Sequence, residues 1–145
     1  MLHRTRLKVR FYELDPYRHV NHAAYIQYFE VARIELLDEV GMGIGQLFAA
    51  GYQLMVTELH IRYLASAGSG DELEVSTEVL ELRRVSSRWR QTIARQGAVV
   101  AEQEIVVAAT NLGGRPVRLP DGLADALHPY LAAPNQTGVA PIVPG

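Results

Sequence analysis

The polar residues best suited to catalysis gather in one short stretch, FYELDPYRHVNHAAY, at residues 11–25. Asp15 lies in a predicted turn, and an apolar segment with helical spacing begins a few residues later, near Asn21 and His22. A carboxylate can act as a general base or a nucleophile, and the first N–H groups of a helix have no partner within the helix. Held close together, these groups can act on one carbonyl and stabilise the oxyanion that forms. We therefore expect an active-site loop that opens onto the N-terminus of a buried helix.

Each of these residues also has a simpler explanation. Asp15 and Pro16 form a pair that is common in turns, and Asn21 is a favourable helix N-cap, whereas its catalytic role would be to hold a water or the carbonyl. His19 and His22 form an H-x-x-H pattern that offers three possible metal ligands together with Asp15. These residues are not the i, i+4 helical pair of zinc hydrolases, so we expect no metal at this site.

The helix that must position this loop is predicted for residues 22–40. Its apolar residues recur at intervals of three and four and gather on one arc of the helix: Tyr25, Ile26, Phe29, Ala32, Leu36, Leu37 and Val40. Gly41 and Gly43 are expected to end it. Arg33 falls in the middle of the apolar arc, where a guanidinium needs partners. We expect an ion pair with Glu30, and the alternative is that Arg33 orients Asp15.

Strands are predicted at residues 5–12 and at about 52–65, 71–85, 86–97 and 98–111, because apolar and polar residues alternate there between turn signals. The alternation changes parity near Thr57 and Glu58, which indicates a bulge. Glu58, beside this bulge, is the second candidate for the catalytic acid. The alternative is that it is an exposed strand residue without a catalytic role. Asp121 is expected to cap a last short helix. Only the helix at 22–40 can cover the apolar sheet face. The fold is therefore predicted to be α+β, a curved antiparallel sheet of about five strands wrapped around one long helix.

Length and composition limit the possible functions. The chain of 145 residues suits one domain, expected at 1–131, followed by a Pro- and Gly-containing tail at 132–145 that we expect to be mobile. A net charge of −2 gives no field that would favour nucleic acid or an anionic membrane. The absence of cysteine excludes disulfides, thiolate metal sites and a cysteine nucleophile. No apolar run approaches the roughly 18 residues of a membrane span, and the start lacks a signal-peptide core, so a cytoplasmic location is expected.

The segment FYELDPYRHVNHAAYIQYFEVAR resembles the signature of hotdog-fold thioesterases of the 4-hydroxybenzoyl-CoA thioesterase and acyl-CoA thioesterase family. IRYLASAGSGDELEV, SSRWRQTIARQGAVVAEQE and GRPVRLP follow in the order of that family. The resemblance implies a hotdog fold and hydrolysis of an acyl thioester, usually an acyl-CoA, without a cofactor, by a homodimer or homotetramer. It puts the catalytic acid at Asp15 and the oxyanion-binding amide at or near His22, beside Asn21. The position three after the acid, often glycine in the family, is Arg18. HVNH is also similar to acyl-carrier-protein thioesterases, so the carrier stays open.

The basic cluster Arg83, Arg84, Arg88 and Arg90 surrounds Trp89 and Ser87. It either holds the phosphates of CoA, with the indole stacked on adenine, or forms a solvated strand face that balances the glutamates at 72–81. RNA binding is a third interpretation, which the net charge argues against. The expected substrate-binding residues are His19, Tyr25, Glu58, Arg83, Arg84, Ser87 and Arg88.

Two other functions compete with thioester hydrolysis. A hotdog hydratase or dehydratase would carry an Asp and a His on the loop after the helix, and residues 41–53 contain neither. A thioester-binding or scaffold protein that lost turnover is the non-enzymatic alternative. The presence of Asp15 favours the enzyme over that alternative.

Overall fold

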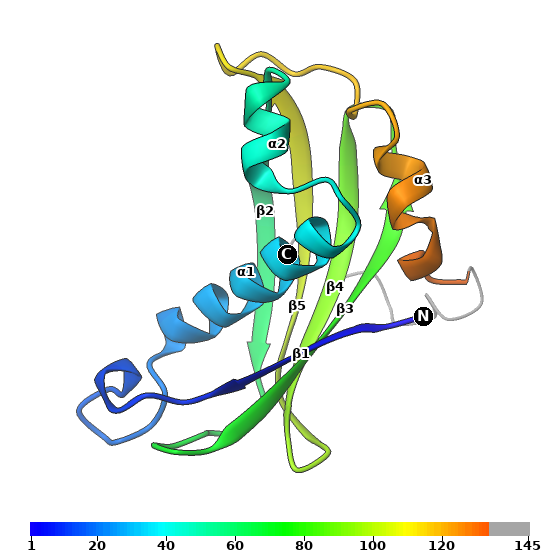
Figure 1. The fold of residues 1–145 in the computed structure, drawn as a ribbon. Helices are drawn as coiled ribbons and strands as arrows, with labels where there is room; N and C mark the ends of the chain where they lie inside the picture. Colours follow the sequence, from blue (N-terminus) through cyan, green and yellow to red (C-terminus); the bar gives the residue numbers. More distant parts are fainter. Residues whose placement is uncertain (134–145) are drawn as a thin grey trace.

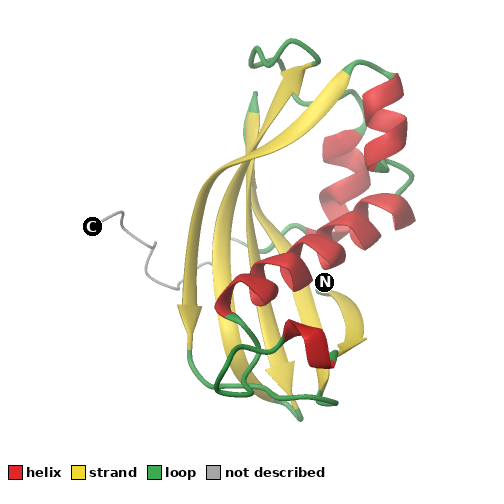
Figure 2. Ribbon diagram, turned by 90° about the vertical axis from the view of Figure 1, so that its left-hand side faces the viewer, coloured by secondary structure: helices red, strands yellow, loops and turns green. Residues whose placement is uncertain are grey.

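The computed structural model describes residues 1–133, so the predicted tail lies outside the described residues except for its first two positions. One antiparallel sheet forms the first layer and helices cover one of its faces, as Figures 1 and 2 show. The strand order is β1–β3–β4–β5–β2. The strands are β1 (His3–Lys8), β2 (Tyr52–Tyr63), β3 (Glu72–Leu82), β4 (Ser86–Arg95) and β5 (Ala98–Asn111).

Three α-helices and two 3-10 turns complete the described chain: α1 (His22–Glu39), α2 (Ile44–Ala49), α3 (Leu123–Leu127), η1 (Phe11–Glu13) and η2 (His128–Tyr130). The long helix α1 crosses the sheet diagonally (Figure 1). The predicted class, a curved antiparallel sheet of five strands with one long helix against it, is confirmed.

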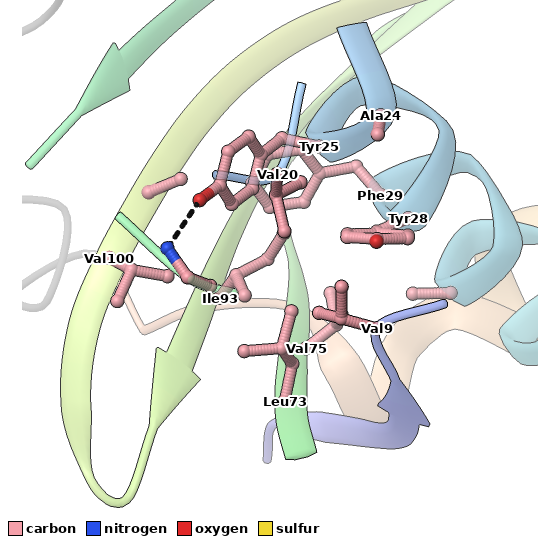
Figure 3. Packing of buried hydrophobic residues seen from close by; sticks show 13 residues of the cluster. Val9, Val20, Ala24, Tyr25, Tyr28, Phe29, Leu73, Val75, Ile93 and Val100 are labelled. Carbon is pink, nitrogen blue, oxygen red and sulfur yellow. Dashed lines mark hydrogen bonds between the residues drawn. The ribbon is translucent and has the colours of Figure 1, made fainter. Parts of the chain in front are cut away.

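The helix α1 is held in place by its apolar face. The predicted arc is buried at Tyr25, Phe29, Ala32, Leu36 and Leu37, and Ala24 and Tyr28 are buried as well. Its first turns pack with β3, β4 and β5 in one core cluster (Figure 3). Its last turns pack in a second cluster around Trp89 and Ile105. The helix ends at Glu39 with Val40 as its C-cap, and the next residue is Gly41, whose φ of +79° few other residues tolerate.

The predicted bulge in β2 is confirmed. The pairing of β2 with β5 shifts between Val56 and Glu58, so Thr57 has no register partner on β5, and its hydroxyl donates to the Val106 carbonyl at 3.4 Å. Because successive strand residues face opposite sides, the extra residue turns Glu58 to the outer sheet face and keeps Ile61 and Tyr63 on the helix side.

Two local predictions were wrong, and the structure adds one helix for which there was no prediction. The first strand runs from His3 to Lys8 rather than over 5–12, because residues 11–13 form the 3-10 turn η1. The segment 41–53, for which no conformation was predicted, contains α2. Asp121 does not cap α3: the N-cap is Gly122, with φ +83° and no side-chain cap. None of the helices in residues 1–133 combines the length and apolar character that crossing a membrane requires.

Candidate active site

Residues 13–21 form a closed hairpin, called here the Asp15 hairpin. The Asn21 amide donates to the Glu13 carbonyl at 2.8 Å, and the Asp15 amide donates to the His19 carbonyl at 2.7 Å. Leu14 and Val20 form a β-bridge between these two hydrogen bonds. The hairpin leads directly into α1, so the position of Asp15 relative to the helix start depends on few rotatable bonds.

The Asp15 carboxylate is oriented by the hairpin itself. Its Oδ1 accepts hydrogen bonds from the amides of Tyr17 at 2.8 Å and His19 at 3.1 Å. Within residues 1–133, Oδ2 accepts no hydrogen bond. The turn interpretation of Asp15 is therefore correct for one oxygen, while the second oxygen retains its capacity to accept a proton. Arg18, next to the hairpin tip, has φ +65°, the left-handed conformation in which glycine is least strained.

The start of α1 presents an unpaired backbone donor. Asn21 is the N-cap, and its Oδ1 accepts a hydrogen bond from the Ala23 amide at 2.9 Å, so the structural interpretation of Asn21 is confirmed. The next amide, of His22, has no acceptor in the described part of the chain. Tyr63, from the end of β2, donates its hydroxyl to the His22 carbonyl at 2.7 Å. This bond joins the end of β2 to the first turn of the helix.

A hollow of about 330 Å³ lies beside these groups. Its lining brings together four of the predicted site residues, Asp15, His19, His22 and Tyr25, with Val20 and the segment 63–66. The neighbouring segment is tied to the site by two hydrogen bonds at Ala67. Its amide donates to the Tyr25 hydroxyl at 3.2 Å, shown as a dashed line in Figure 3, and its carbonyl accepts from the Val20 amide at 2.8 Å.

The two tyrosines that line the hollow have shifted pKa values. Burial raises the pKa of Tyr25, and burial also raises the pKa of Tyr63. Both phenols therefore stay protonated near neutral pH and serve as hydrogen-bond partners rather than as bases. The remaining titratable groups in the lining are His19 and His22, which are exposed. No cluster of three His, Asp or Glu side chains among residues 1–133 is arranged to hold a metal ion.

The predicted arginine cluster lies elsewhere. Arg88 pairs with Glu104 at 3.1 Å and with Glu81 at 3.5 Å, and Arg83 also pairs with Glu81. Arg90 pairs closely with Glu78. The same cluster includes Arg84, which is exposed and has no ion pair within the described residues. The solvated-face interpretation thus describes most of the cluster.

The aromatic member of that cluster faces the core. Trp89 is 2% exposed, and its indole N–H donates to the Ser87 hydroxyl at 2.7 Å. Ser87 is itself buried. The expected stacking of the indole on adenine does not fit this structure, because no ring face is open to solvent.

Glu58, the second candidate acid, is not near Asp15. It lies opposite Val106 on the outer sheet face and lines a separate hollow with Arg88 and Glu104. Tyr63 pairs with Ala101, five residues along β5 from Val106, a separation of about 17 Å. The structure thus brings Glu58 together with Arg88 and separates both from the Asp15 hairpin.

Arg33 has a different partner from the predicted one. No ion pair joins it to Glu30 in the described chain; instead its Nη1 donates to the Gln91 side-chain oxygen at 3.0 Å. Gln91 is fully buried and also donates to the Phe29 carbonyl at 2.9 Å. Burial lowers the pKa of Arg33, and the charge of Glu30 opposes this shift from a distance. The predicted local ion pair was wrong because the Arg33 guanidinium is hydrogen-bonded to Gln91, a side chain of β4, instead of to Glu30.

Three residues at the site were missed by the sequence analysis: Tyr63, Glu13 and Tyr28. Tyr63 holds the first helical carbonyl, and Glu13 accepts the hydroxyl of Tyr28 at 2.9 Å. One signal was available. Tyr28 lies three residues after Tyr25 on the buried side of the helix, and a buried phenol requires a hydrogen-bond partner.

Comparisons with known proteins agree on one kind of protein. Residues 9–127 match the family model described as the thioesterase-like superfamily. The long-chain acyl-CoA thioesterase FadM of Escherichia coli is 31% identical over 110 residues, which cover 74% of this chain and 83% of FadM. The chloroplastic acyl-acyl carrier protein thioesterase ATL2 of Arabidopsis thaliana is 35% identical over 91 residues, 63% of this chain. The match spans 48% of the length of ATL2.

Among solved structures, the hypothetical protein TT1821 of Thermus thermophilus superposes with a TM-score of 0.82 at 31% identity, covering 88% of this chain and 98% of that one. A probable thioesterase of Bartonella henselae superposes with a TM-score of 0.80 at 25% identity, covering 83% of this chain and 100% of that one. The hotdog architecture expected from the sequence is therefore confirmed.

Proposed function

Because the chain belongs to the thioesterase-like superfamily, we propose that it hydrolyses an acyl thioester to a carboxylic acid and a thiol, with Asp15 and the His22 amide as its catalytic groups. The observation that supports this most is their placement. A carboxylate with a free oxygen and an unpaired helix-start amide lie at one hollow. Within residues 1–133, no donor is bonded to the free oxygen of Asp15 and no acceptor is bonded to the His22 amide.

In the proposed mechanism, Asp15 Oδ2 takes a proton from a water molecule, whose oxygen attacks the thioester carbonyl carbon. The carbonyl oxygen becomes an oxyanion and accepts a hydrogen bond from the His22 amide, where the helix dipole also favours negative charge. The C–S bond then breaks, and the proton held by Asp15 passes to the leaving thiolate. The amides of Tyr17 and His19 keep the carboxylate aimed during these steps.

Asn21, which does not line the hollow, and two residues of the lining have supporting roles in this proposal. Asn21 uses its Oδ1 for the helix cap, so its Nδ2 is the part that can hold the attacking water or the carbonyl. His19 and Tyr25 contact the substrate along the hollow. The tyrosine ring is fixed by its hydroxyl bond to Ala67, so it provides a rigid surface.

We infer that two copies of the chain associate along β2. The two edge strands of the sheet differ in character: β1 is short and carries Arg4, Arg6 and Lys8, a composition that discourages pairing. The opposite edge, β2, is twelve residues long. Its exposed apolar side chains include Met55, Val56, Leu59 and Tyr63. A second copy paired on β2 would cover them.

This pairing also suggests where CoA would bind. If two β2 strands pair antiparallel about a two-fold axis, the arginine end of one copy lies at the same end of the joined sheet as the Asp15 hairpin of the other. Arg84 is then the member of its cluster best able to contact a CoA phosphate, because it is exposed and unpaired in the described chain. An acyl carrier protein, the carrier in the name of ATL2, is the alternative thiol carrier.

A substrate panel tests the proposed activity. Purified protein is incubated with acyl-CoA esters of graded chain length, with the same acyl groups on pantetheine and on acyl carrier protein, and with a thiol reagent. Release of thiol above background from at least one ester is the expected result. Correctly folded protein that releases no thiol from any ester would make the chain a non-catalytic thioester-binding protein.

The proposed association has its own test. Light scattering should give the wild type at least twice the 16.1 kDa mass of one chain. Leu59→Glu on the β2 edge should shift the mass toward one chain, while Arg6→Glu on the β1 edge should not. A monomeric wild type at micromolar concentration would contradict the proposed interface.

A further inference from the structure

We propose that Glu13 and Tyr28 are positioning residues that hold the Asp15 hairpin in register with the start of α1. Neither lines the hollow that contains Asp15 and His22, so they act on the reaction through the hairpin. This inference rests on the proposed thioesterase function and adds two residues to the machinery of that site.

The Glu13 carboxylate is the centre of a compact set of contacts. Its Oε1 accepts the Tyr28 hydroxyl at 2.9 Å and the Arg10 amide at 2.7 Å. Its Oε2 lies 3.6 Å from the Arg10 guanidinium. One side chain therefore joins the chain entering the hairpin to the second turn of α1, and no part of this connection involves the substrate hollow.

Tyr28 is a firm attachment point. It is 2% exposed, and its ring packs at 6.1 Å from that of Tyr25 in the core cluster (Figure 3). Burial raises the pKa of Tyr28, and the hydrogen bond to Glu13 raises it further. The phenol is thus a permanent donor whose position is set by the core. Within residues 1–133, Glu13 is the acceptor of its hydroxyl proton.

The position of Glu13 determines that of Asp15. The carbonyl of Glu13 accepts the Asn21 amide at 2.8 Å, which forms the base of the hairpin, and Asp15 follows two residues later. The hairpin has a second attachment, from the Val20 amide to the Ala67 carbonyl. With Glu13 in place, the two sides of the hairpin are attached to different parts of the fold. Without the Glu13 side chain the backbone bonds inside the hairpin remain, but the hairpin loses its attachment to Tyr28 of α1 and can pivot as a unit about the Val20–Ala67 attachment.

Such a pivot affects the reaction more than it affects folding. The Asp15 side chain would still form its hydrogen bonds with Tyr17 and His19, although these would open more often in the less firmly held hairpin, and the core around α1 would remain packed. The distance from the carboxylate to the carbonyl above the His22 amide would no longer be fixed, however. A displacement near 1 Å in a reacting group can reduce the rate by about 10²-fold. The expected signature is therefore a lower kcat with little change in KM.

Four variants test this inference. Glu13→Ala should lower kcat by about 30-fold and Tyr28→Phe by about 10-fold, with KM within about twofold of wild type. Glu13→Gln should recover most of the activity, since its amide oxygen can still accept the Tyr28 hydroxyl and the Arg10 amide. Tyr130→Phe is the matched control, a tyrosine of η2 outside the hollow, and should leave kcat unchanged.

Amide hydrogen exchange gives a readout that needs no activity. The Tyr17 and His19 amides, which donate to Asp15, should exchange about tenfold faster in Glu13→Ala and in Tyr28→Phe than in wild type or Tyr130→Phe. Wild-type protein without thioesterase activity would refute the proposed function, and the exchange rates would still test the attachment. If Glu13→Ala and Tyr28→Phe match Tyr130→Phe in kcat and in exchange, the positioning role is wrong.

Discussion

The Asp15 hairpin and the β3–β4 turn lie at opposite ends of the sheet, and both are rich in polar side chains. At the arginine end, Arg83 and Arg88 are paired with Glu81, and Arg88 also with Glu104. At the hairpin end, one Asp15 oxygen accepts no hydrogen bond and the His22 amide has no acceptor within residues 1–133. The two ends resemble each other in composition and differ in how much hydrogen-bonding capacity is left unused.

This difference explains which polar cluster can be an active site. A charge already neutralised by a neighbour gains little from a substrate, because the existing pair must first be broken. An unpaired amide beside an available carboxylate loses nothing when it binds a reacting carbonyl. Residue types made both ends candidate sites in the sequence. The two ends can be distinguished only by the ion pairs and hydrogen bonds that their side chains form in the structure. The predictions below test this contrast, beginning with the largest expected effect.

Replacing the carboxylate charge should have the largest effect. Asp15→Asn keeps an Oδ1 for the Tyr17 and His19 amides, so the hairpin should remain folded, whereas Asp15→Ala would also remove those two contacts. We expect Asp15→Asn to lower kcat by about 10² or more, with the Tm near that of wild type. The matched variant is Glu58→Gln on the outer sheet face, which should retain wild-type kcat. Similar losses in the two variants would remove the distinction between the two ends.

Loosening the helix start should have an intermediate effect. Tyr63→Phe removes the hydroxyl that donates to the His22 carbonyl at 2.7 Å. The ring keeps its contact with Tyr25, and the substitution should cost little packing because Tyr63 is 44% exposed. We expect kcat to fall by about three- to tenfold, because the first turn of α1 becomes less rigid. Steady-state kinetics on the preferred ester measure this. An unchanged kcat would show that the cap at Asn21 holds the helix start alone.

Substitutions at the arginine end should separate stability from substrate binding. Arg88→Ala breaks two partly exposed ion pairs and should lower the free energy of unfolding by about 0.5–1 kcal/mol, with kcat unchanged. Arg84→Glu should leave stability unchanged and raise KM for acyl-CoA about threefold, but not KM for the acyl-pantetheine, which lacks the nucleotide. Equal effects of Arg84→Glu on the two substrates would show that Arg84 does not contact the nucleotide of CoA and belongs to a solvated strand face.

The smallest expected effect concerns backbone strain in the hairpin. Arg18 has φ +65°, and Arg18→Gly should stabilise the protein by about 0.5–1 kcal/mol in urea denaturation, since relief of strain exceeds the added freedom of the unfolded chain. Gln96→Gly, at a φ of +50° in the β4–β5 turn, should show a similar gain. If Arg18→Gly changes kcat and Gln96→Gly does not, the arginine side chain itself contributes to the active site.

The sequence was most informative where residue periodicity controls structure. The boundaries of α1, the four later strands and the bulge beside Thr57 follow from apolar spacing, because that spacing determines which face can be buried. In the segment 41–53, Ile44, Leu47 and Phe48 have helical spacing, but the segment is short and interrupted by four glycines, so α2 was not predicted. The ion pair of Arg33 was assigned to Glu30 from sequence distance, and Gln91 is its neighbour only after the sheet has formed.

The candidate site was predictable in part for the same reason. Asp15, Asn21 and His22 are close in sequence, so a local pattern could bring them together. Tyr63 is 41 residues from His22, and its contact depends on the bulge that turns the end of β2 toward α1. The arginine cluster failed as a guide because a pattern of like charges contains no information on the partners that neutralise them.

The central claim, that an unpaired amide at the start of α1 acts on the same carbonyl as Asp15, has a direct test in the kcat of His22→Pro measured beside that of His22→Ala. Proline suits the first helical position, and the preceding Asn21 already has φ −58° and ψ 138°, which proline tolerates before it. The substitution therefore removes one N–H and keeps the helix. We predict that kcat falls by about 10²–10³ in His22→Pro and stays near wild type in His22→Ala. Equal activity of the two variants would contradict the account.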